Sequence, residues 1–378
     1  MTSVSKVLVV GGGIAGLSAT LALRRAGIDV DVVEVNRRWD VYGVGIIQPA
    51  NSLRAMAALG LADACVERGF AFEGSRFHDR EGNVLMDIPF ERLAGPDHPP
   101  MNGITRPRLH EILTSAARAS GAGIRLGVTV ADISQAPDAV EVAFTDDTRG
   151  AYDLLIGADG INSLVRKLVF GPDPSPAYTG QVCWRYNVAR RPQVERLFMY
   201  VGTRGKAGLV PLADDLMYLL LIEKPPSEDV RLERTGQAGL LRERLAEYGG
   251  LIGELRDTAI TDDEAVVYRP VESLLMEPPW HHGRVVLIGD AVHASSPHMG
   301  QGAALAVEDA VVLGELLTGG DPVALVLDRF VQRRWERAKW VVESSLEIGR
   351  LEQSASPDND RRAMGIVAQS AHVMAAPV

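Results

Sequence analysis

The sequence predicts an α/β fold in which a Rossmann-like nucleotide-binding domain carries an inserted antiparallel β-sheet. Three observations predict it. A valine-rich run at 6–10 leads straight into the glycine turn Gly11-Gly12-Gly13-Ile14-Ala15-Gly16, and a helical pattern follows. Two later apolar runs end where an aspartate adjoins a glycine. The middle of the chain alternates apolar and polar positions, as antiparallel strands with one buried face do.

The beginning of the chain has the pattern of one β-α-β unit. Residues 6–10 have the valine content of a buried parallel strand. Residues 14–26 have the apolar positions of a helix, and Gly27 is expected to end it. Residues 28–35 predict a second strand, which contains Glu34. A strand, a glycine turn, a helix and an acid in the next strand together predict a dinucleotide site.

Each part of the glycine turn has a physical reason. Gly11 permits the tight turn, and Gly13 lets the backbone approach a pyrophosphate. Gly16 lets the helix pack closely against the strand. The helix N-terminus then faces the anion, while Glu34 accepts hydrogen bonds from ribose hydroxyls. The turn residues expected to hold the pyrophosphate are Gly11, Gly13, Ile14, Ala15 and Gly16.

The two later apolar runs indicate that the dinucleotide is FAD. The first ends at Asp159, and Ser163 or Asn162 is placed to cap the helix after it. The second ends at Asp290, and a loop rich in proline and glycine then leads into a helix. Asp290 is placed to accept a hydrogen bond from a ribityl hydroxyl, and the N–H groups near 300–303 face the flavin pyrimidine edge. Helix capping explains one such aspartate, but not two at strand ends beside a glycine turn.

Charge and composition argue against other classes of partner. A net charge of −10 and a pI near 5.4 argue against nucleic acid and anionic membranes, because both attract basic patches. Two cysteines, Cys65 and Cys183, do not support a disulfide framework. His281-His282 has no evident third ligand, so no metal site is expected. No apolar run reaches the roughly 18 residues of a membrane span, and a cytoplasmic location is expected.

The alternating pattern divides the chain into two domains. The FAD-binding domain is expected at 1–71, 101–175 and 271–350, and the substrate domain at 72–100 and 176–270. Substrate is expected between them, because clefts at domain interfaces are usual ligand sites. Strands of the inserted sheet are expected at 181–188, 197–201, 208–211 and 216–222, with two more strand-like pieces in 72–90 and a charged helix at 233–248.

The end of the chain carries one strong helical pattern and a weaker one. Residues 329–339 predict a helix that packs through Trp335 and Trp340, and the charges of Arg334 and Arg337 are expected to be solvated. Solvation of these charges is expected in preference to ligand binding by them. The tail at 351–378 is rich in alanine and polar residues, which predicts a short helix or partial disorder.

These motifs occur in the order seen in single-component FAD-dependent aromatic hydroxylases, which the chain resembles from about residue 5 to about residue 350. These are the relatives of p-hydroxybenzoate, salicylate, 6-hydroxynicotinate and urate hydroxylases. The resemblance rests on the glycine turn with Glu34, on 157–160, and on Gly289-Asp290 followed by 297–302. It extends to 43–51, 104–106, 178–180 and Trp184-Arg185.

The resemblance implies non-covalent FAD, with NADH or NADPH as a transient reductant. O2 would form a flavin C4a-hydroperoxide, whose oxygen passes to an electron-rich aromatic or heteroaromatic ring. Asp159 would contact both FAD and NAD(P)H, Arg106 would lie near the FAD phosphates or ribityl chain, and Val130 near the adenine. Gln48 is a candidate contact to the flavin ring, with an exposed turn position as its alternative. The loop expected beside the flavin contributes Pro297, Gly300, Gln301, Gly302 and Ala303.

Hydroxylation needs a dry pocket and a group that raises the electron density of the substrate, and for a phenol-like ring that group is a general base. His298 is the first candidate because its loop is expected beside the flavin; its alternative is a plain polar contact. Urate hydroxylases have aspartate after this proline, so His298 argues against their specificity. Tyr218 matches a substrate-contacting tyrosine or is a core aromatic. Arg185 binds an acidic substrate group or is a surface charge, and Lys206 lies near an arginine of that family.

The leading hypothesis is an FAD-dependent monooxygenase, monomer or homodimer, whose partners are a small aromatic substrate, O2 and NAD(P)H. A flavin-dependent halogenase shares the fold, but it needs a Trp-x-Trp-x-Ile-Pro run, and the nearest text here is Trp-Arg-Tyr-Asn-Val at 184–188. A prenyl-chain reductase would need a long apolar tunnel. A non-catalytic flavin-binding protein is the alternative from another class.

Overall fold

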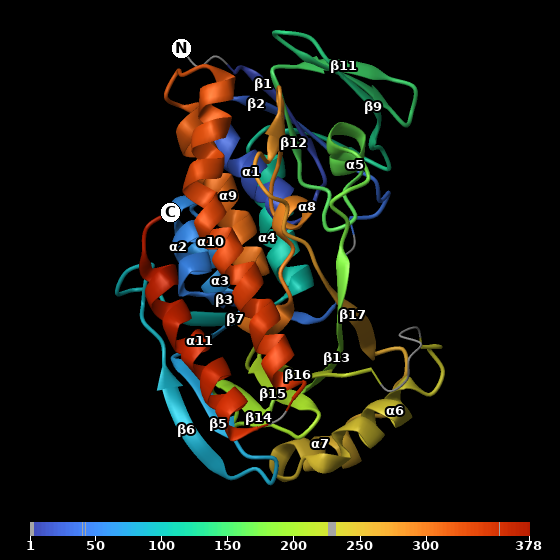
Figure 1. Cartoon of the computed structure of the whole chain (residues 1–378), viewed down its shortest axis with the longest axis vertical. Helices are drawn as coiled ribbons and strands as arrows, with labels where there is room; N and C mark the ends of the chain where they lie inside the picture. The colour runs from blue at the N-terminus through green and yellow to red at the C-terminus, as the bar shows by residue number, and fades with distance from the viewer. Residues whose placement is uncertain (1–3, 40, 42, 226–231, 355) are drawn as a thin grey trace.

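The computed structural model describes residues 4–39, 41, 43–225, 232–354 and 356–378. Two large sheets organise these residues, and Figure 1 shows one towards each end of the molecule, with long helices running between them. One sheet is mostly parallel and the other mostly antiparallel. The expected α/β fold, a Rossmann-like domain with an inserted antiparallel sheet, is confirmed.

The six-stranded sheet is built around β1 (Lys6–Val10), which pairs in parallel with β2 (Asp29–Glu34) and β12 (Leu154–Gly157). The four residues after Lys6 are buried, because β1 lies at the centre of the sheet and is covered on both faces. The helix α1 (Ile14–Arg25) starts directly after the glycine turn, as predicted. The strand order is β18-β19-β12-β1-β2-β8, with β18 (His281–His282), β19 (Val285–Leu287) and β8 (Gly123–Leu126).

The seven-stranded sheet follows the order β17-β13-β16-β15-β14-β5-β6 and confirms the strands expected in the middle of the chain. Its neighbours are antiparallel except β14 and β5, which are parallel. The strands are β17 (Val267–Ser273), β13 (Ala177–Ala189), β16 (Leu216–Glu223), β15 (Gly205–Pro211), β14 (Leu197–Val201), β5 (Gly74–His78) and β6 (Val84–Pro89).

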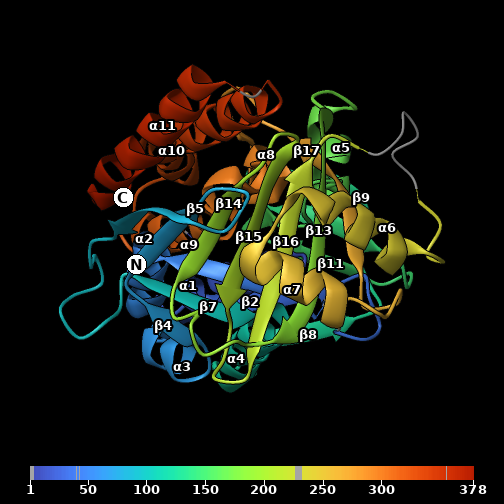
Figure 2. The same cartoon turned by 90° about the horizontal axis from the view of Figure 1, so that it is seen from below.

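The two faces of this sheet have different partners. Alternate residues of β13 such as Trp184 and Tyr186 pack in one apolar cluster with Leu241 and Leu255, which come from α6 (Gln237–Arg244) and α7 (Gly250–Thr258). Figure 2 shows these two helices lying across the sheet. Cys183 belongs to a separate cluster on the opposite face, and its side of the sheet turns towards the other domain.

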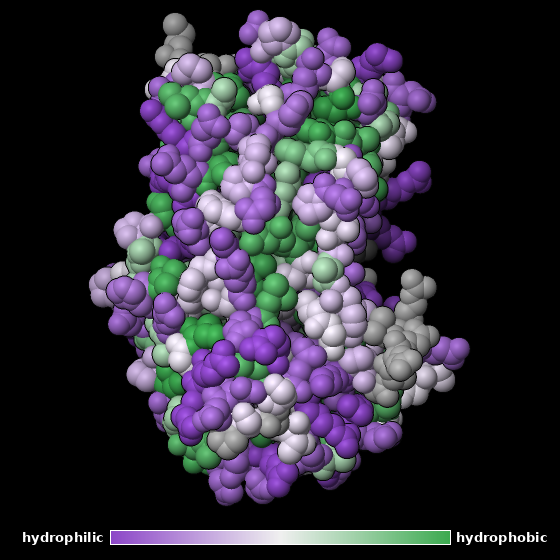
Figure 3. All heavy atoms as spheres, in the orientation of Figure 1, coloured by the Kyte–Doolittle hydropathy of each residue, from purple (hydrophilic) through white to green (hydrophobic). Residues whose placement is uncertain are grey.

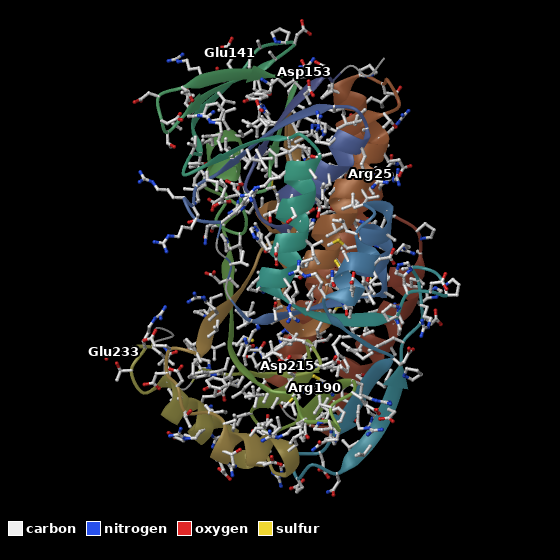
Figure 4. All side chains as sticks on the ribbon, turned by 180° about the vertical axis from the view of Figure 1, so that it is seen from behind. Arg25, Glu141, Asp153, Arg190, Asp215 and Glu233 are labelled. Carbon is white, nitrogen blue, oxygen red and sulfur yellow. The ribbon has the colours of Figure 1, made fainter. Side chains whose placement is uncertain are left out.

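Smaller elements complete both domains. Figure 4 places Glu141 on an outer hairpin at the end of the molecule that carries the six-stranded sheet, and Arg190 beside Asp215 at the end that carries the seven-stranded sheet. The backbone N–H of Arg190 donates to the Asp215 carbonyl at 2.9 Å. The small sheets are β11-β10-β9 and β3-β7-β4, with β9 (Val130–Gln135), β10 (Val140–Phe144), β11 (Arg149–Tyr152), β3 (Gly45–Pro49), β7 (Met101–Thr105) and β4 (Phe70–Phe72). The further helices are α2 (Ala50–Ala58), α3 (Ala62–Glu67), α4 (Arg106–Ala119), α5 (Leu164–Phe170), α8 (Asp290–His293) and α9 (Gly302–Leu317), with short 3-10 turns η1 (Leu245–Glu247) and η2 (Pro297–Met299).

The helix α10 (Val323–Glu352) is 30 residues long and runs from the FAD-binding domain to the seven-stranded sheet (Figure 1). The expectation that Arg334 and Arg337 are solvated is wrong. Both are buried, Arg334 within 2.8 Å of Asp309 and Arg337 within 3.0 Å of Glu308. The physical reason is that α9 buries two adjacent carboxylates against α10, and buried carboxylates need cationic partners.

The tail forms one 19-residue helix, α11 (Pro357–Ala375), longer than the sequence suggests. Arg54 and Arg337 donate to its last carbonyls, including Ala375 at 2.8 Å and Val373 at 2.7 Å, which satisfies groups that a helix end leaves without partners. In Figure 3 the face that carries α10 and α11 is largely hydrophilic, with apolar residues in separate patches. Partly buried residues of α11, such as Met364 and Val367, face inward and line a cavity.

Candidate active site

A cavity of about 780 Å³ lies where the two domains meet. Its wall includes the glycine turn, β3, the loop at 294–303, one face of the seven-stranded sheet, the end of α10 and α11. This volume is within the range of roughly 300–1,000 Å³ that ligand pockets usually have. The cavity therefore brings the predicted nucleotide turn and the predicted substrate sheet into one site.

The glycine turn has one open position, Gly13, and three crowded ones, Gly11, Gly12 and Gly16. A Cβ added at Gly11, which has φ +110°, would lie 2.4 Å from the Ala158 carbonyl oxygen, and one at Gly16 would lie 1.9 Å from that of Gly11. Nothing lies within 4 Å of a Cβ added at Gly13, and Gly13, Ile14 and Ala15 line the cavity. The crowded glycines shape the turn, and Gly13 leaves the space that a pyrophosphate needs.

Two aromatic residues that were not predicted from the sequence contact the backbone of this turn. Trp39 Nε1 donates to the Gly12 carbonyl at 2.9 Å, and His110 Nε2 lies 3.1 Å from the same oxygen. His110 also lines the cavity. Its signal in the sequence is its position four residues after Arg106 on one helix, which places both side chains on the same face.

Glu34 lies at the end of β2, as predicted, and contacts the turn directly. Its carboxylate accepts from the backbone N–H of Gly12 at 2.8 Å and from Asn36 at 2.9 Å. The residue is thus placed beside the glycine turn, where the ribose next to the pyrophosphate is expected. Its contact with ribose hydroxyls stays a prediction.

Gly11, Gly16 and Glu34 adjoin the cavity without lining it, and three further predicted cofactor residues also do not line it. Asp159 accepts from the backbone N–H groups of Leu164 and Val165 at 2.6 and 3.0 Å, so its carboxylate caps α5. Gln48 is buried and accepts from Asn102 at 2.9 Å, so it is not an exposed turn residue either. Val130 is buried in the apolar core. Their predicted contacts with FAD stay predictions, while Asp159 takes the capping role that the sequence also allowed.

The other cofactor candidates meet at the middle of the cavity. Asp290 faces it, and the surrounding protein raises the pKa of its carboxyl by desolvation. Arg106 lies close enough to Arg185 that, after burial, this like charge lowers the pKa of Arg106. Among the described residues, the guanidinium groups of Arg106 and Arg185 have no hydrogen-bond or ion-pair partner. The loop residues Pro297, Gly300, Gln301, Gly302 and Ala303 line the same region.

These residues fit FAD. Gly13 leaves room at the N-terminus of α1, and Arg106 offers a positive charge with no protein partner among the described residues. Asp290 offers acceptors to hydroxyl groups. The N-terminus of α9 follows the loop and begins at Gly302, so backbone N–H groups there have no partner within the helix.

The substrate candidates lie on the seven-stranded sheet. Tyr218 on β16 and Arg185 on β13 line the cavity together with Cys183. The Tyr218 ring packs on β3, because a Cβ added at Gly45 would lie 2.4 Å from its Cδ1. Burial raises the pKa of Tyr218 to about 12, so the phenol keeps its proton at neutral pH. Burial also raises the pKa of the Cys183 thiol.

His298 lines the cavity, and its side chain is only 1% exposed. Ser296 Oγ lies 2.8 Å from its Nδ1, and Glu352 Oε2 lies 3.4 Å from its Nε2. Burial first, and then the charge of Lys206, hold the pKa of His298 well below its usual value. Lys206 in turn lies 2.7 Å from Glu352 Oε1. No sequence signal pointed to Glu352, because it ends a helix whose partners are remote in the chain.

Other predicted features lie away from the cavity. His281 lies 3.0 Å from Asp328, and His282 contacts Gln135, so the adjacent histidines have different partners. His293 lies 2.7 Å from Asp309 of α9 and is fully buried. Within the described part of the chain, no helix combines the length and apolar character that crossing a membrane requires.

Comparison with known proteins gives consistent results along the whole chain. The family described as "FAD binding domain" matches residues 4–249 and 251–345. The 2-heptyl-3-hydroxy-4(1H)-quinolone synthase of Pseudomonas aeruginosa is 34% identical over 355 residues, which cover 93% of this chain and 90% of the relative. The FAD-dependent urate hydroxylase of Klebsiella pneumoniae is 30% identical over 345 residues, with coverage of 89% and 88%.

A solved structure shows the same architecture with ligands bound. It is Klebsiella pneumoniae HpxO complexed with FAD and uric acid, which is 25% identical and superposes with a TM-score of 0.85 over 98% of this chain and 96% of that one. The likeness therefore extends over both sheets and the helices between them.

Proposed function

The chain belongs to the FAD binding domain family and is a FAD-dependent monooxygenase, and from this premise we propose that it uses NADH or NADPH and O2 to hydroxylate a nitrogen heteroaromatic ring that carries an apolar substituent. The observation that carries the proposal is the single cavity that joins the glycine turn to the seven-stranded sheet. A relative that makes a heptylquinolone and another that acts on urate support a nitrogen heteroaromatic ring as substrate.

FAD, when bound, would take reducing equivalents from NAD(P)H and activate O2 by the route that the family resemblance implies. The protein's own residues supply binding and position. Gly13 and the N-terminus of α1 would receive the pyrophosphate, Arg106 would balance its charge, and Asp290 would accept from hydroxyl groups. The loop from Pro297 would border the reacting end, because it joins the FAD-binding half of the cavity to the sheet half.

The far wall of the cavity supports the apolar substituent. Met364 and Val367 of α11 line it, as do Leu220 and Ile222 of β16. These side chains come from different domains and face one space, so an alkyl group between them would be shielded from water. Such shielding also protects a reactive oxygen donor from hydrolysis and side reactions.

Arg185 and Tyr218 are proposed to contact the ring. Arg185 has no partner among the described residues, so a carbonyl or an anionic group on the substrate would satisfy its donors. The Tyr218 hydroxyl keeps its proton and can donate a hydrogen bond. Their positions on neighbouring strands place both groups on one side of the cavity.

The relatives favour a monooxygenase over the halogenase and the prenyl-chain reductase considered from sequence. The test uses the FAD-loaded protein with NADH and NADPH in turn and a panel of 2-heptyl-4(1H)-quinolone, 4(1H)-quinolone and urate. NAD(P)H consumption is corrected for peroxide, and products are identified by mass after reaction in ¹⁸O2. The expected result is one labelled oxygen in a hydroxylated heteroaromatic product. The proposal fails if no compound accelerates NAD(P)H oxidation and none gains an oxygen.

A further inference from the structure

Three polar side chains from distant parts of the chain meet in the cavity wall. Lys206 comes from β15, His298 from η2 and Glu352 from the last residue of α10. All three line the cavity. Lys206 Nζ lies 2.7 Å from Glu352 Oε1, and the two side chains are only 15% and 17% exposed. One oxygen of Glu352 is therefore held by a cation.

The second carboxylate oxygen is buried and lacks a hydrogen-bond partner among the described residues. Glu352 Oε2 and His298 Nε2 lie 3.4 Å apart, yet neither has a hydrogen-bond partner among the described residues. Two buried polar atoms without partners, side by side in a cavity wall, indicate a ligand that would bridge them, because unpaired buried polar groups are costly. Glu352 Oε2 is a hydrogen-bond acceptor and lies beside the ring nitrogen of His298. This pair matches a ligand that carries an N–H or O–H group on an aromatic ring.

The fold makes this meeting possible at Gly349. It lies one turn before Glu352, and a Cβ there would come within 2.6 Å of Gln181 Oε1 and 3.0 Å of His298 Cε1. Only a residue without a side chain lets α10 approach the histidine so closely. The amide of Gln181 is buried beside them and also has no hydrogen-bond partner among the described residues.

We propose that Glu352 accepts a proton from the substrate ring, that Lys206 holds its carboxylate in place, and that His298 positions the ring. This inference rests on the proposed function. It assigns the role of general base to Glu352 instead of His298, which was the first candidate from the sequence. In the transfer, the N–H or O–H bond of the ring breaks, its proton bonds to Glu352 Oε2, and its electron pair stays on the ring. The ring becomes more electron-rich, which is what an electrophilic oxygen donor requires.

The charges around Glu352 support this assignment over His298. Burial raises the pKa of Glu352, while Lys206 acts in the opposite direction and Asp360 of α11 raises it further. Tyr248 also faces it. Burial and Lys206 hold the pKa of His298 well below its usual value, so its imidazole binds a proton weakly. The raised pKa makes the Glu352 carboxylate a stronger base than an ordinary one, while the lowered pKa makes the His298 imidazole a weaker base than usual.

The experiment compares E352Q, E352D and K206M with the parent enzyme, using 2-heptyl-4(1H)-quinolone and its N-methyl analogue, which has no ring proton to lose. We expect E352Q to lower kcat/KM for the hydroxylated quinolone about 10²-fold, the usual contribution of a general base. E352D should recover part of this loss. In the parent enzyme kcat/KM falls as the pH drops through the Glu352 pKa; E352Q removes this acidic limb, and K206M moves it to higher pH.

E343Q is the matched control, because Glu343 lies on the same helix, is 59% exposed and pairs with Lys339 at 4.0 Å. FAD content and Tm show whether each variant is folded. A spectroscopic readout is independent of turnover: difference absorbance should show the quinolone anion bound to the parent enzyme and the neutral quinolone bound to E352Q. The inference is overturned if E352Q keeps kcat/KM within twofold, or keeps the acidic limb, or binds the anion equally well. If the parent enzyme hydroxylates nothing, the proposed function fails, and the absorbance still decides the role of Glu352.

Discussion

Lys206 Nζ and Glu352 Oε1 lie 2.7 Å apart, although the lysine belongs to the inserted sheet and the glutamate ends the long helix of the FAD-binding domain. The ion pair joins the two domains at the cavity wall. Poorly exposed pairs of this kind are screened less by salt than surface pairs. The geometry of the site therefore depends on how α10 meets the sheet.

Replacing Gly349 with alanine tests this contact. The new Cβ would lie 2.6 Å from Gln181 Oε1, so we expect a loss of about 1–3 kcal/mol in the free energy of unfolding, typical of an overpacked site. Gly365→Ala is the matched control on α11, where nothing lies within 4 Å of the added Cβ, and it should gain about 0.5–1 kcal/mol. Urea denaturation measures both. Equal stabilisation by the two alanines would contradict the crowding at Gly349.

Gly13 and Gly16 should respond differently to alanine. Gly13→Ala has room in the protein, so the fold should persist while FAD binding weakens about 10-fold, or about 1.4 kcal/mol, because the Cβ occupies the pyrophosphate space. Gly16→Ala places its Cβ 1.9 Å from the Gly11 carbonyl oxygen and should lower the Tm of the FAD-free protein itself. Flavin fluorescence titration and thermal unfolding separate the two effects. Unchanged FAD affinity in Gly13→Ala would argue against the pyrophosphate placement.

Asp309 should make the free energy of unfolding depend on pH in the acidic range. Burial alone would raise its pKa, but His293 and Arg334 together lower the pKa below the usual value. A depressed folded-state pKa gives stability that is present above the unfolded-state pKa, near 3.9, and is lost as the pH falls through the folded-state value. Asp309→Asn should lose about 1–3 kcal/mol at neutral pH, because it removes one of the two buried carboxylates beside Arg334 and leaves Glu308, at 3.0 Å, as its remaining anionic partner.

The control for this pair is Glu264→Gln, which removes the exposed pair with Arg234 and should cost less than about 1 kcal/mol. Urea unfolding from neutral pH down to about pH 3 gives both the loss and its pH dependence. Asp309→Asn should also flatten the acid slope. A parent-like slope in this variant would show that other carboxyl groups dominate acid unfolding.

Shortening α11 side chains tests the apolar wall. Met364→Ala and Val367→Ala should raise KM for 2-heptyl-4(1H)-quinolone several-fold, because each buried CH2 contributes about 0.8 kcal/mol. KM for 4(1H)-quinolone, which lacks the chain, should change little. Gln369→Ala, at an exposed position of the same helix, is the control. Equal effects on both quinolones would place the alkyl chain elsewhere.

The sequence predicted the features that depend on local pattern. The β1–α1–β2 unit is encoded by valine runs, glycines and helical spacing within about thirty residues, and the strands of the large sheet by their alternation. It did not reveal Glu352, because the contact with Lys206 joins segments far apart in the chain. The burial of Arg334 was missed for the same reason. An aspartate that follows a strand can bind a ligand or cap the next helix, and Asp159 caps α5.

The length of α10 limits how reactants can enter the site and how product can leave it. At 30 residues it is about 45 Å long, and its buried face contacts the FAD-binding domain at one end and the substrate sheet at the other. A hinge opening between the domains would bend this helix and separate Lys206 from Glu352. Reactants would therefore enter, and product would leave, by displacement of a smaller cover. The near half of α11 suits that task, since Arg54 and Arg337 hold its far end, while the near half is tied to α10 through the more exposed pair of Arg362 with Glu347.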